Sequence, residues 1–142
     1  MKFDPYMYRY ASRRNLVYAN RGMVGTASPL ASQIGLEMIK KGGNAIDAAI
    51  ATAAALSVVE PSGNGIGGDN FAIVWFEGKM YGLNSSGAAP ALMTYDAIKN
   101  KGYDEITKFG LDPVSVPGIP SGWVALSKRF GKLPLSEVLE PA

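Results

Sequence analysis

The stretch "NAIDAAIATAAALSVVEPSGNGIGGDNFAIVWF", residues 44–76, predicts a helix, a glycine-rich connection and a strand in direct succession. Asn44 is a favourable N-cap, and Asp47 in the first turn complements the positive end of the helix dipole. Residues 45–59 are apolar on nearly every face and rich in alanine, so we expect a helix that is buried on most sides. Pro61 then ends this helix, because proline cannot continue one.

The segment after the glycines predicts a hairpin. Residues 71–76 are aromatic and β-branched, which is typical of a buried strand, and Glu77-Gly78 suits a tight turn into a partner strand over 79–83. Two strands cannot stand alone, so helices packed on this antiparallel pair need more sheet. We therefore expect an α+β fold that is incomplete in this chain, with the 142 residues forming one part of a larger domain.

The sequence before residue 44 predicts one further helix. Ser28 is a good N-cap, and Pro29 suits the first helical position, where its missing N–H group does not matter. Leu30 is expected on the apolar face of this helix. The aromatic and basic residues 1–20 predict an N-terminal arm that lies on the surface of the body.

The sequence after the hairpin alternates helices with loops. The patterns predict helices over 94–101 and 123–130, and the first turns of another helix within 133–142. Prolines and glycines crowd residues 112–122, so we expect no regular structure there.

Charge and composition exclude several classes of function. The net charge is only +2 and the 14 Lys and Arg residues are scattered, so we expect no nucleic-acid partner. The chain has no cysteine and no histidine, which excludes thiol chemistry, Ser-His pairs and ordinary zinc sites. The longest apolar run, residues 48–59, is too short to cross a bilayer, and the start lacks a signal-peptide core. We therefore expect a cytoplasmic protein with no membrane partner.

The carboxylates offer no catalytic pair. Asp47, Glu60, Asp69 and Asp96 show no spacing that would bring two of them together, which predicts unpaired surface acids. We expect no catalytic residue, no metal ligand and no cofactor site in these 142 residues. If the chain belongs to an enzyme, its nucleophile lies elsewhere.

The glycine-rich loop, with four glycines between Gly63 and Gly68, does not fit a phosphate-binding loop. Such loops run from strand to helix, whereas here a helix precedes and a strand follows, and no Lys-Ser/Thr pair is present. A tight entry into the strand, with glycines where a β-carbon would clash, is the interpretation that we favour over a ligand site. We expect Glu60 and Asp69 to bond backbone amides, and Asp69 and Asn70 to help orient neighbouring loops.

Several motifs in series resemble the γ-glutamyltransferase (γ-glutamyltranspeptidase) family. They are "PLAS", "KKGGNAIDAAIA", "VVEP", "GIGGDNF", "SVPGIPSGWVAL" and "FGKLPLSEVLEPA", in the order that this family has them. The resemblance covers residues 21–142, which would be the N-terminal portion of the large subunit. The opening segment looks more like the cytoplasmic bacterial and archaeal members than the secreted ones.

The resemblance implies an N-terminal-nucleophile hydrolase, with two antiparallel sheets between layers of helices. Members are zymogens that cut themselves before a threonine, whose hydroxyl then attacks a γ-glutamyl amide while its own amine serves as base. That threonine would lie beyond residue 142, on the small subunit, which is the expected partner. The implied substrates are small γ-glutamyl or acyl amides, and this chain alone is expected to be inactive.

One substrate-binding residue of the family is expected in this chain. Members that bind γ-glutamyl groups carry an arginine four residues before a proline, and in "LNSSGAAP", residues 83–90, that position is Ser86. A guanidinium pairs with a carboxylate through two charge-assisted hydrogen bonds, whereas a serine hydroxyl offers one neutral bond. Ser86 is thus the candidate substrate contact, and its lack of charge puts a preference for glutathione in question.

Two alternatives remain open at this point. The protein could be an acylase or amide hydrolase of the same family that acts on other acyl groups, as Ser86 suggests. It could also be a non-catalytic domain that pairs with a partner, because no nucleophile is visible in these residues.

Overall fold

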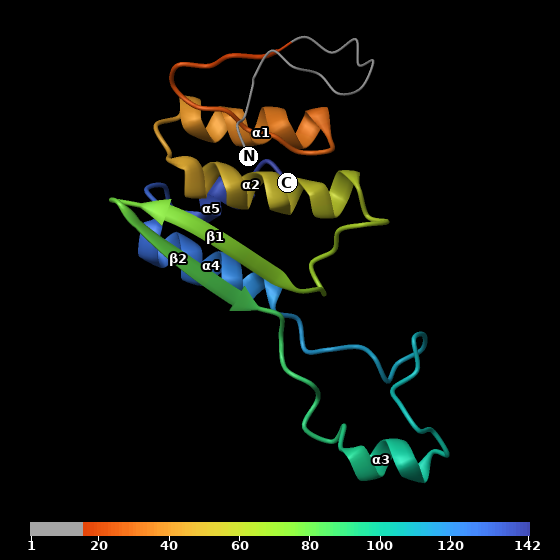
Figure 1. Cartoon of the computed structure of the whole chain (residues 1–142). Helices are drawn as coiled ribbons and strands as arrows, with labels where there is room; N and C mark the ends of the chain where they lie inside the picture. Colours follow the sequence, from red (N-terminus) through yellow and green to blue (C-terminus); the bar gives the residue numbers. More distant parts are fainter. Residues whose placement is uncertain (1–15) are drawn as a thin grey trace, which may run out of the picture.

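The computed structural model describes residues 16–142 and contains five helices and one hairpin in that part of the chain (Figure 1). Most of the predicted arm over residues 1–20 therefore lies outside the described residues. The elements are α1 (Pro29–Lys40), α2 (Ala45–Val59), β1 (Asn70–Phe76), β2 (Lys79–Ser85), α3 (Tyr95–Asn100), α4 (Ile119–Phe130) and α5 (Leu135–Leu139).

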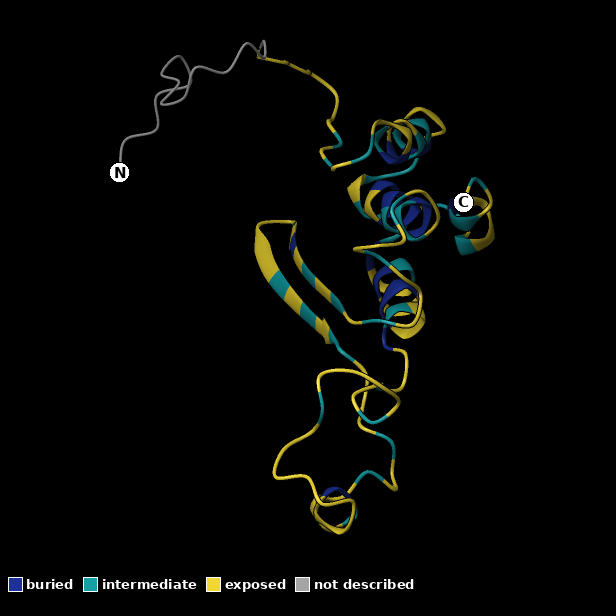
Figure 2. Cartoon of the chain, turned by 90° about the vertical axis from the view of Figure 1, so that its right-hand side faces the viewer, coloured by how far each residue is buried: buried dark blue, intermediate teal, exposed yellow. Residues whose placement is uncertain are grey.

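The helices form layers beside the hairpin, and α2 lies at the centre of the contacts. It packs against α1 on one side and against α4 and α5 on the other, while α4 contacts both strands (Figures 1 and 2). The core is continuous through these elements. Its buried members are Met38, Ala48, Ile50, Ala51, Ala54, Val74, Trp123, Leu126, Phe130 and Val138. No helix among residues 16–142 is long and apolar enough to span a membrane.

Helix α2 begins as its sequence predicts. The Asn44 side chain accepts hydrogen bonds from the backbone N–H groups of Ile46 and Asp47, at 2.9 and 3.1 Å. The Asp47 carboxylate accepts from the Asn44 N–H at 2.8 Å, which completes a capping box.

Helix α1 also starts at the predicted residue, with Ser28 as its N-cap and Pro29 in the first turn. The prediction that Leu30 faces the core is wrong, because its side chain is largely exposed. The buried face instead carries Ala31, Gly35 and Met38 against α2. The helices approach closely at Gly35, where a β-carbon would lie 2.2 Å from the buried Thr52 Oγ1.

Strands β1 and β2 pair antiparallel, with Phe76 opposite Lys79, so Glu77 and Gly78 form a two-residue turn. Both turn residues have positive φ, as a type I′ turn requires.

The prediction of a buried strand over 71–76 is wrong for one of its two faces. Phe71, Ile73 and Trp75 are exposed, Ile73 to 82%, whereas Val74 on the opposite face is buried. Successive side chains of a strand point to opposite faces, and α4 covers only the face that bears Val74.

The expectation of no regular structure through residue 122 is also wrong at its end. Helix α4 begins at Ile119, four residues before the predicted start at Trp123. Pro120 does not prevent this, because the first turn of a helix has no partner for the missing N–H group.

Helix α3 lies within the predicted range 94–101, with Thr94 as its N-cap, and α5 confirms the helix expected after residue 133.

Candidate functional site

Ser86, the residue singled out by the sequence, lies directly after β2, where three segments of the chain meet. The other two segments are the end of the glycine-rich loop and the residues that lead into α4. Gly68 joins these two, since its carbonyl oxygen accepts hydrogen bonds from the N–H groups of Gly118 and Ile119, at 3.2 and 3.3 Å. Ser86 is half-buried, and its backbone N–H donates to Asn84 Oδ1 at 3.1 Å.

A pair of serine hydroxyls fixes the exit of β2 to the start of α4. Ser85 Oγ lies 2.6 Å from the carbonyl oxygen of Gly118, and Ser121 Oγ lies 2.7 Å from the same oxygen. The two hydroxyls are 2.9 Å apart, and either can donate to the other. Each hydroxyl has one proton, so at any moment two of these three contacts are hydrogen bonds. We call Ser85, Gly118 and Ser121 the serine clamp.

The backbones at the clamp approach too closely for side chains. A β-carbon on Gly118 would lie 2.0 Å from the Ser85 carbonyl oxygen, and one on Gly87 would lie 1.9 Å from the Val116 carbonyl oxygen. Gly87 also has a φ of +79°, which glycine adopts without strain. The clamp and its glycines therefore hold the backbone on both sides of Ser86 in one conformation.

The glycines of the 63–68 loop do not have the role expected for them. A β-carbon on Gly63, Gly65 or Gly67 would meet nothing within 4 Å, and none of these residues has a positive φ. The prediction that β-carbons would clash inside this loop is therefore wrong. The exclusion occurs at Gly87 and Gly118 instead, because the segments there are packed backbone to backbone.

Three of the acidic residues differ from the prediction. Asp47 is fully buried rather than a surface acid, and besides the Asn44 N–H its carboxylate accepts from the N–H groups of Lys132 and Leu133. Glu60 accepts from the side-chain amide of Asn64 at 3.2 Å and not from a backbone amide.

Asp69 and Asp96 are exposed, as expected, but no backbone amide of residues 16–142 donates to the Asp69 carboxylate, so that part of the prediction is wrong. Within residues 16–142 no three acidic residues come together in a way that could hold a metal ion.

A small polar cavity of about 120 Å³ lies beside the clamp. It is lined by Ala53, Ser57, Asn64, Gly65, Asp69, Asn70, Ile119 and Trp123. The Asn70 side-chain nitrogen is buried, and no atom of residues 16–142 accepts its hydrogen bond. A cavity of this size has room for water, which suits an amide without a protein partner. The sequence suggested a positioning role for Asn70 but gave no sign of Ser85 or Ser121.

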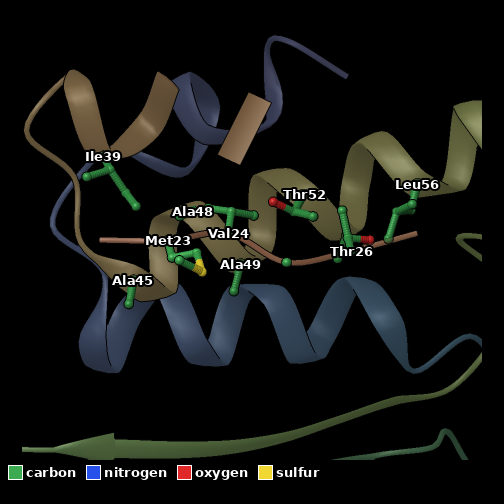
Figure 3. Close-up of a pocket in the computed structure, with 11 residues that line it drawn as sticks. Met23, Val24, Thr26, Ile39, Ala45, Ala48, Ala49, Thr52 and Leu56 are labelled. Atoms are coloured by element: carbon green, nitrogen blue, oxygen red, sulfur yellow. The ribbon is translucent and has the colours of Figure 1, made fainter. Parts of the chain in front are cut away.

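A larger cavity of about 360 Å³ lies between the segment 23–26 and helices α1 and α2 (Figure 3). Its lining includes Ile39, Thr52 and Leu56 and no titratable side chain. It therefore offers no titratable group for acid–base chemistry. None of its lining residues belongs to the serine clamp or to the hairpin.

Solved structures with similar chains confirm the α+β fold. Cephalosporin acylase from Bacillus halodurans is 57% identical with a TM-score of 0.89, and the match covers 99% of this chain and 26% of that chain. γ-Glutamyltranspeptidase from Helicobacter pylori is 33% identical with a TM-score of 0.82, over 90% of this chain and 38% of that chain. The helices and the antiparallel hairpin therefore form part of the N-terminal-nucleophile hydrolase fold.

Curated sequences give the same relationship. The glutathione hydrolase-like YwrD proenzyme of Bacillus subtilis (strain 168) is 41% identical over 134 residues, which cover 87% of this chain and 25% of that protein. The chain thus spans about a quarter of the length of the curated relatives that it matches. Residues 31–142 match the family described as gamma-glutamyltranspeptidase. On the evidence of these residues, the chain belongs to the gamma-glutamyltranspeptidase family.

Proposed function

We propose that the complete protein is a γ-glutamyltransferase or glutathione hydrolase that cleaves γ-glutamyl amide bonds. The observation that carries this proposal is the family match over residues 31–142, together with the similarity to a solved γ-glutamyltranspeptidase. In this proposal the precursor cuts itself, and the hydroxyl of a new N-terminal threonine outside these residues attacks the amide carbonyl. The α-amine of the same threonine takes up the hydroxyl proton, so the reaction needs no histidine.

The 142 residues would then supply scaffold and one wall of the site. The serine clamp holds the backbone beside Ser86, and the Ser86 hydroxyl is the proposed substrate contact. Catalysis depends on positioning within fractions of an ångström, so a fixed backbone at this residue favours that role. The second subunit of the processed precursor is the proposed partner.

Expressing the longer protein, which extends beyond residue 142, tests the proposal. We expect two polypeptides after purification, the smaller one beginning with threonine, and release of the anilide from a γ-glutamyl anilide. Replacing that threonine with alanine should leave a single uncut chain without activity. A protein that stays uncut and inactive in its native sequence would refute the proposal.

The second candidate is an acylase that acts on amides other than γ-glutamyl ones. Two observations favour it: Ser86 is uncharged, and the cephalosporin acylase from Bacillus halodurans is 57% identical. An uncharged hydroxyl gains little from a substrate α-carboxylate, whereas a guanidinium would pair with it at about 1.5–3 kcal/mol per charge-assisted hydrogen bond.

Turnover of a γ-glutamyl anilide and of a neutral acyl anilide distinguishes the two candidates. The variant Ser86→Arg should raise kcat/KM for the γ-glutamyl compound by roughly tenfold or more, since one such bond is worth at least that factor. The control Ser62→Arg adds the same charge at an exposed position just before the loop glycines. It should leave the ratio of the kcat/KM values for the γ-glutamyl and the neutral anilide unchanged. A native enzyme that already requires the α-carboxylate would exclude the acylase.

The cytoplasmic location expected from the sequence stays a prediction, which fractionation of the source cells tests. The division into an arm over residues 1–20 and a body over residues 21–142 likewise stays a prediction.

A further inference from the structure

Residues 88–116, which we call the apolar arm, leave the body between β2 and α4 and return to it at nearly the same point (Figures 1 and 2). The two ends are joined by a hydrogen bond from the Val116 N–H to the Ala88 carbonyl oxygen, at 2.9 Å. The arm holds one short helix, α3, and no residue of the arm belongs to the hydrophobic core of the body.

The arm exposes large apolar side chains to an unusual degree. Leu92 is 90% exposed, Phe109 87% and Leu111 89%. Five more large apolar side chains of the arm are exposed: Tyr95, Tyr103, Ile106, Val114 and Val116. Ile98 is the arm's only buried residue. Apolar groups gathered in this way on one segment mark an interaction surface, whereas single exposed ones are ordinary.

The charges of the arm do not provide an alternative binding surface. Lys99 forms an ion pair with Asp104, and Lys101 forms one with Asp112, all four within the arm. The arm carries three lysines and four acids, so its net charge is near zero. A partner attracted by charge, such as a nucleic acid or an anionic membrane, gains little here. The partner surface that fits is apolar and uncharged.

We propose that the apolar arm docks onto the part of the precursor that lies outside these 142 residues. The relatives of the chain are about four times as long, so a large body of polypeptide is expected beside it. The proposal rests on the proposed function only in taking the protein to be such a longer precursor. The apolar arm begins two residues after Ser86, so docking would also restrain the segment that carries the proposed substrate contact.

Thiol labelling of the complete protein tests this docking. Leu92→Cys, Phe109→Cys and Leu111→Cys are placed one at a time in a background without other cysteines, and the rate of reaction with a maleimide is measured before and after unfolding in urea. The matched control is Glu105→Cys, an exposed polar position of the same arm. We expect each apolar position to react at least tenfold more slowly in the native protein than in the unfolded one. Glu105→Cys should differ by less than threefold.

Native rates at all three apolar positions equal to that of Glu105→Cys would overturn the proposal. Protection that disappears on dilution, together with a doubled mass at high concentration, would assign the surface to a second copy and would also overturn it. Trypsin cleavage at Lys108 can be measured on the wild-type protein, so no substitution disturbs this test. Docking should protect the arm from cleavage there. Rapid cleavage there in the native protein would again contradict docking.

The result of the labelling experiment can be told apart from the result of the activity test of the proposed function. An inactive complete protein that protects these positions refutes the function and supports the docking, and an active enzyme with fully reactive thiols does the reverse.

Discussion

Replacing Asp47 with alanine should destabilise the protein more than any other single loss of a carboxylate described above. The Asp47 carboxylate lies in the core and accepts from the backbone N–H groups of Asn44 at 2.8 Å and Lys132 at 3.1 Å. The N–H group of Leu133, at 3.4 Å, adds a weaker contact. In the alanine variant these N–H groups would lose their acceptor, the fully buried carboxylate.

The size of the effect follows from the number of donors. A hydrogen bond to a charged group is worth about 1.5–3 kcal/mol, and two such bonds are lost here together with one weak one. Some of this is offset because the variant no longer buries a charge. We expect the free energy of unfolding to fall by about 3–5 kcal/mol, which is a large part of the 5–15 kcal/mol that is typical of a whole domain. Asp47→Asn keeps one oxygen but turns an NH₂ group toward a backbone N–H, so it should lose about 2–4 kcal/mol.

Urea unfolding, followed by the fluorescence of the buried Trp123, measures the change. The matched control is Asp96→Ala, which removes an acid from the first turn of α3 at an exposed position. That control should lose no more than about 1 kcal/mol, the usual size of a dipole effect at the surface. If Asp47→Ala unfolds within 1 kcal/mol of Asp96→Ala, the reasoning about the buried carboxylate fails.

Two further predictions concern close contacts. Gly118→Ala, whose β-carbon would lie 2.0 Å from the Ser85 carbonyl oxygen, should cost about 1–3 kcal/mol through overpacking and so lower the thermal midpoint of unfolding by at least about 2 °C. Gly63→Ala, with nothing within 4 Å of its β-carbon, should leave the midpoint nearly unchanged. Gly35→Ala should lower the free energy of unfolding by about 1–3 kcal/mol, because its β-carbon meets Thr52 Oγ1. In a double-mutant cycle, adding Thr52→Ala should restore most of this loss. Additive losses would show that the two positions do not clash.

The helices could be predicted from sequence because their signals are local. The start of α2 follows from Asn44 and Asp47, which lie three residues apart, and the start of α1 follows from Ser28 and Pro29. The two-residue turn at Glu77 has the same local character. Such signals depend on neighbouring residues alone, so a single sequence contains them in full.

Several of the failures concern contacts between distant segments. The burial of Asp47 depends on residues 132–133, and no pattern around position 47 reveals them. The glycine requirement at Gly118 depends on the path of the backbone at Ser85, which composition cannot show. Ser86 could be proposed only from a resemblance, and its structural surroundings add the clamp that the sequence did not suggest.

The junction around Asn44 also has a consequence for biosynthesis. Asn44 Nδ2 donates to the carbonyl oxygen of Phe130 at 2.6 Å, so the two groups that join are 86 positions apart in the chain. At about 5–20 residues per second, a ribosome needs on the order of 4–17 s to make the intervening polypeptide. During that interval the Asn44 side chain has no Phe130 carbonyl to donate to, and the Asp47 carboxylate has no Lys132 N–H to accept from. This interval is when a chaperone that holds apolar helices would be of greatest use to the growing chain.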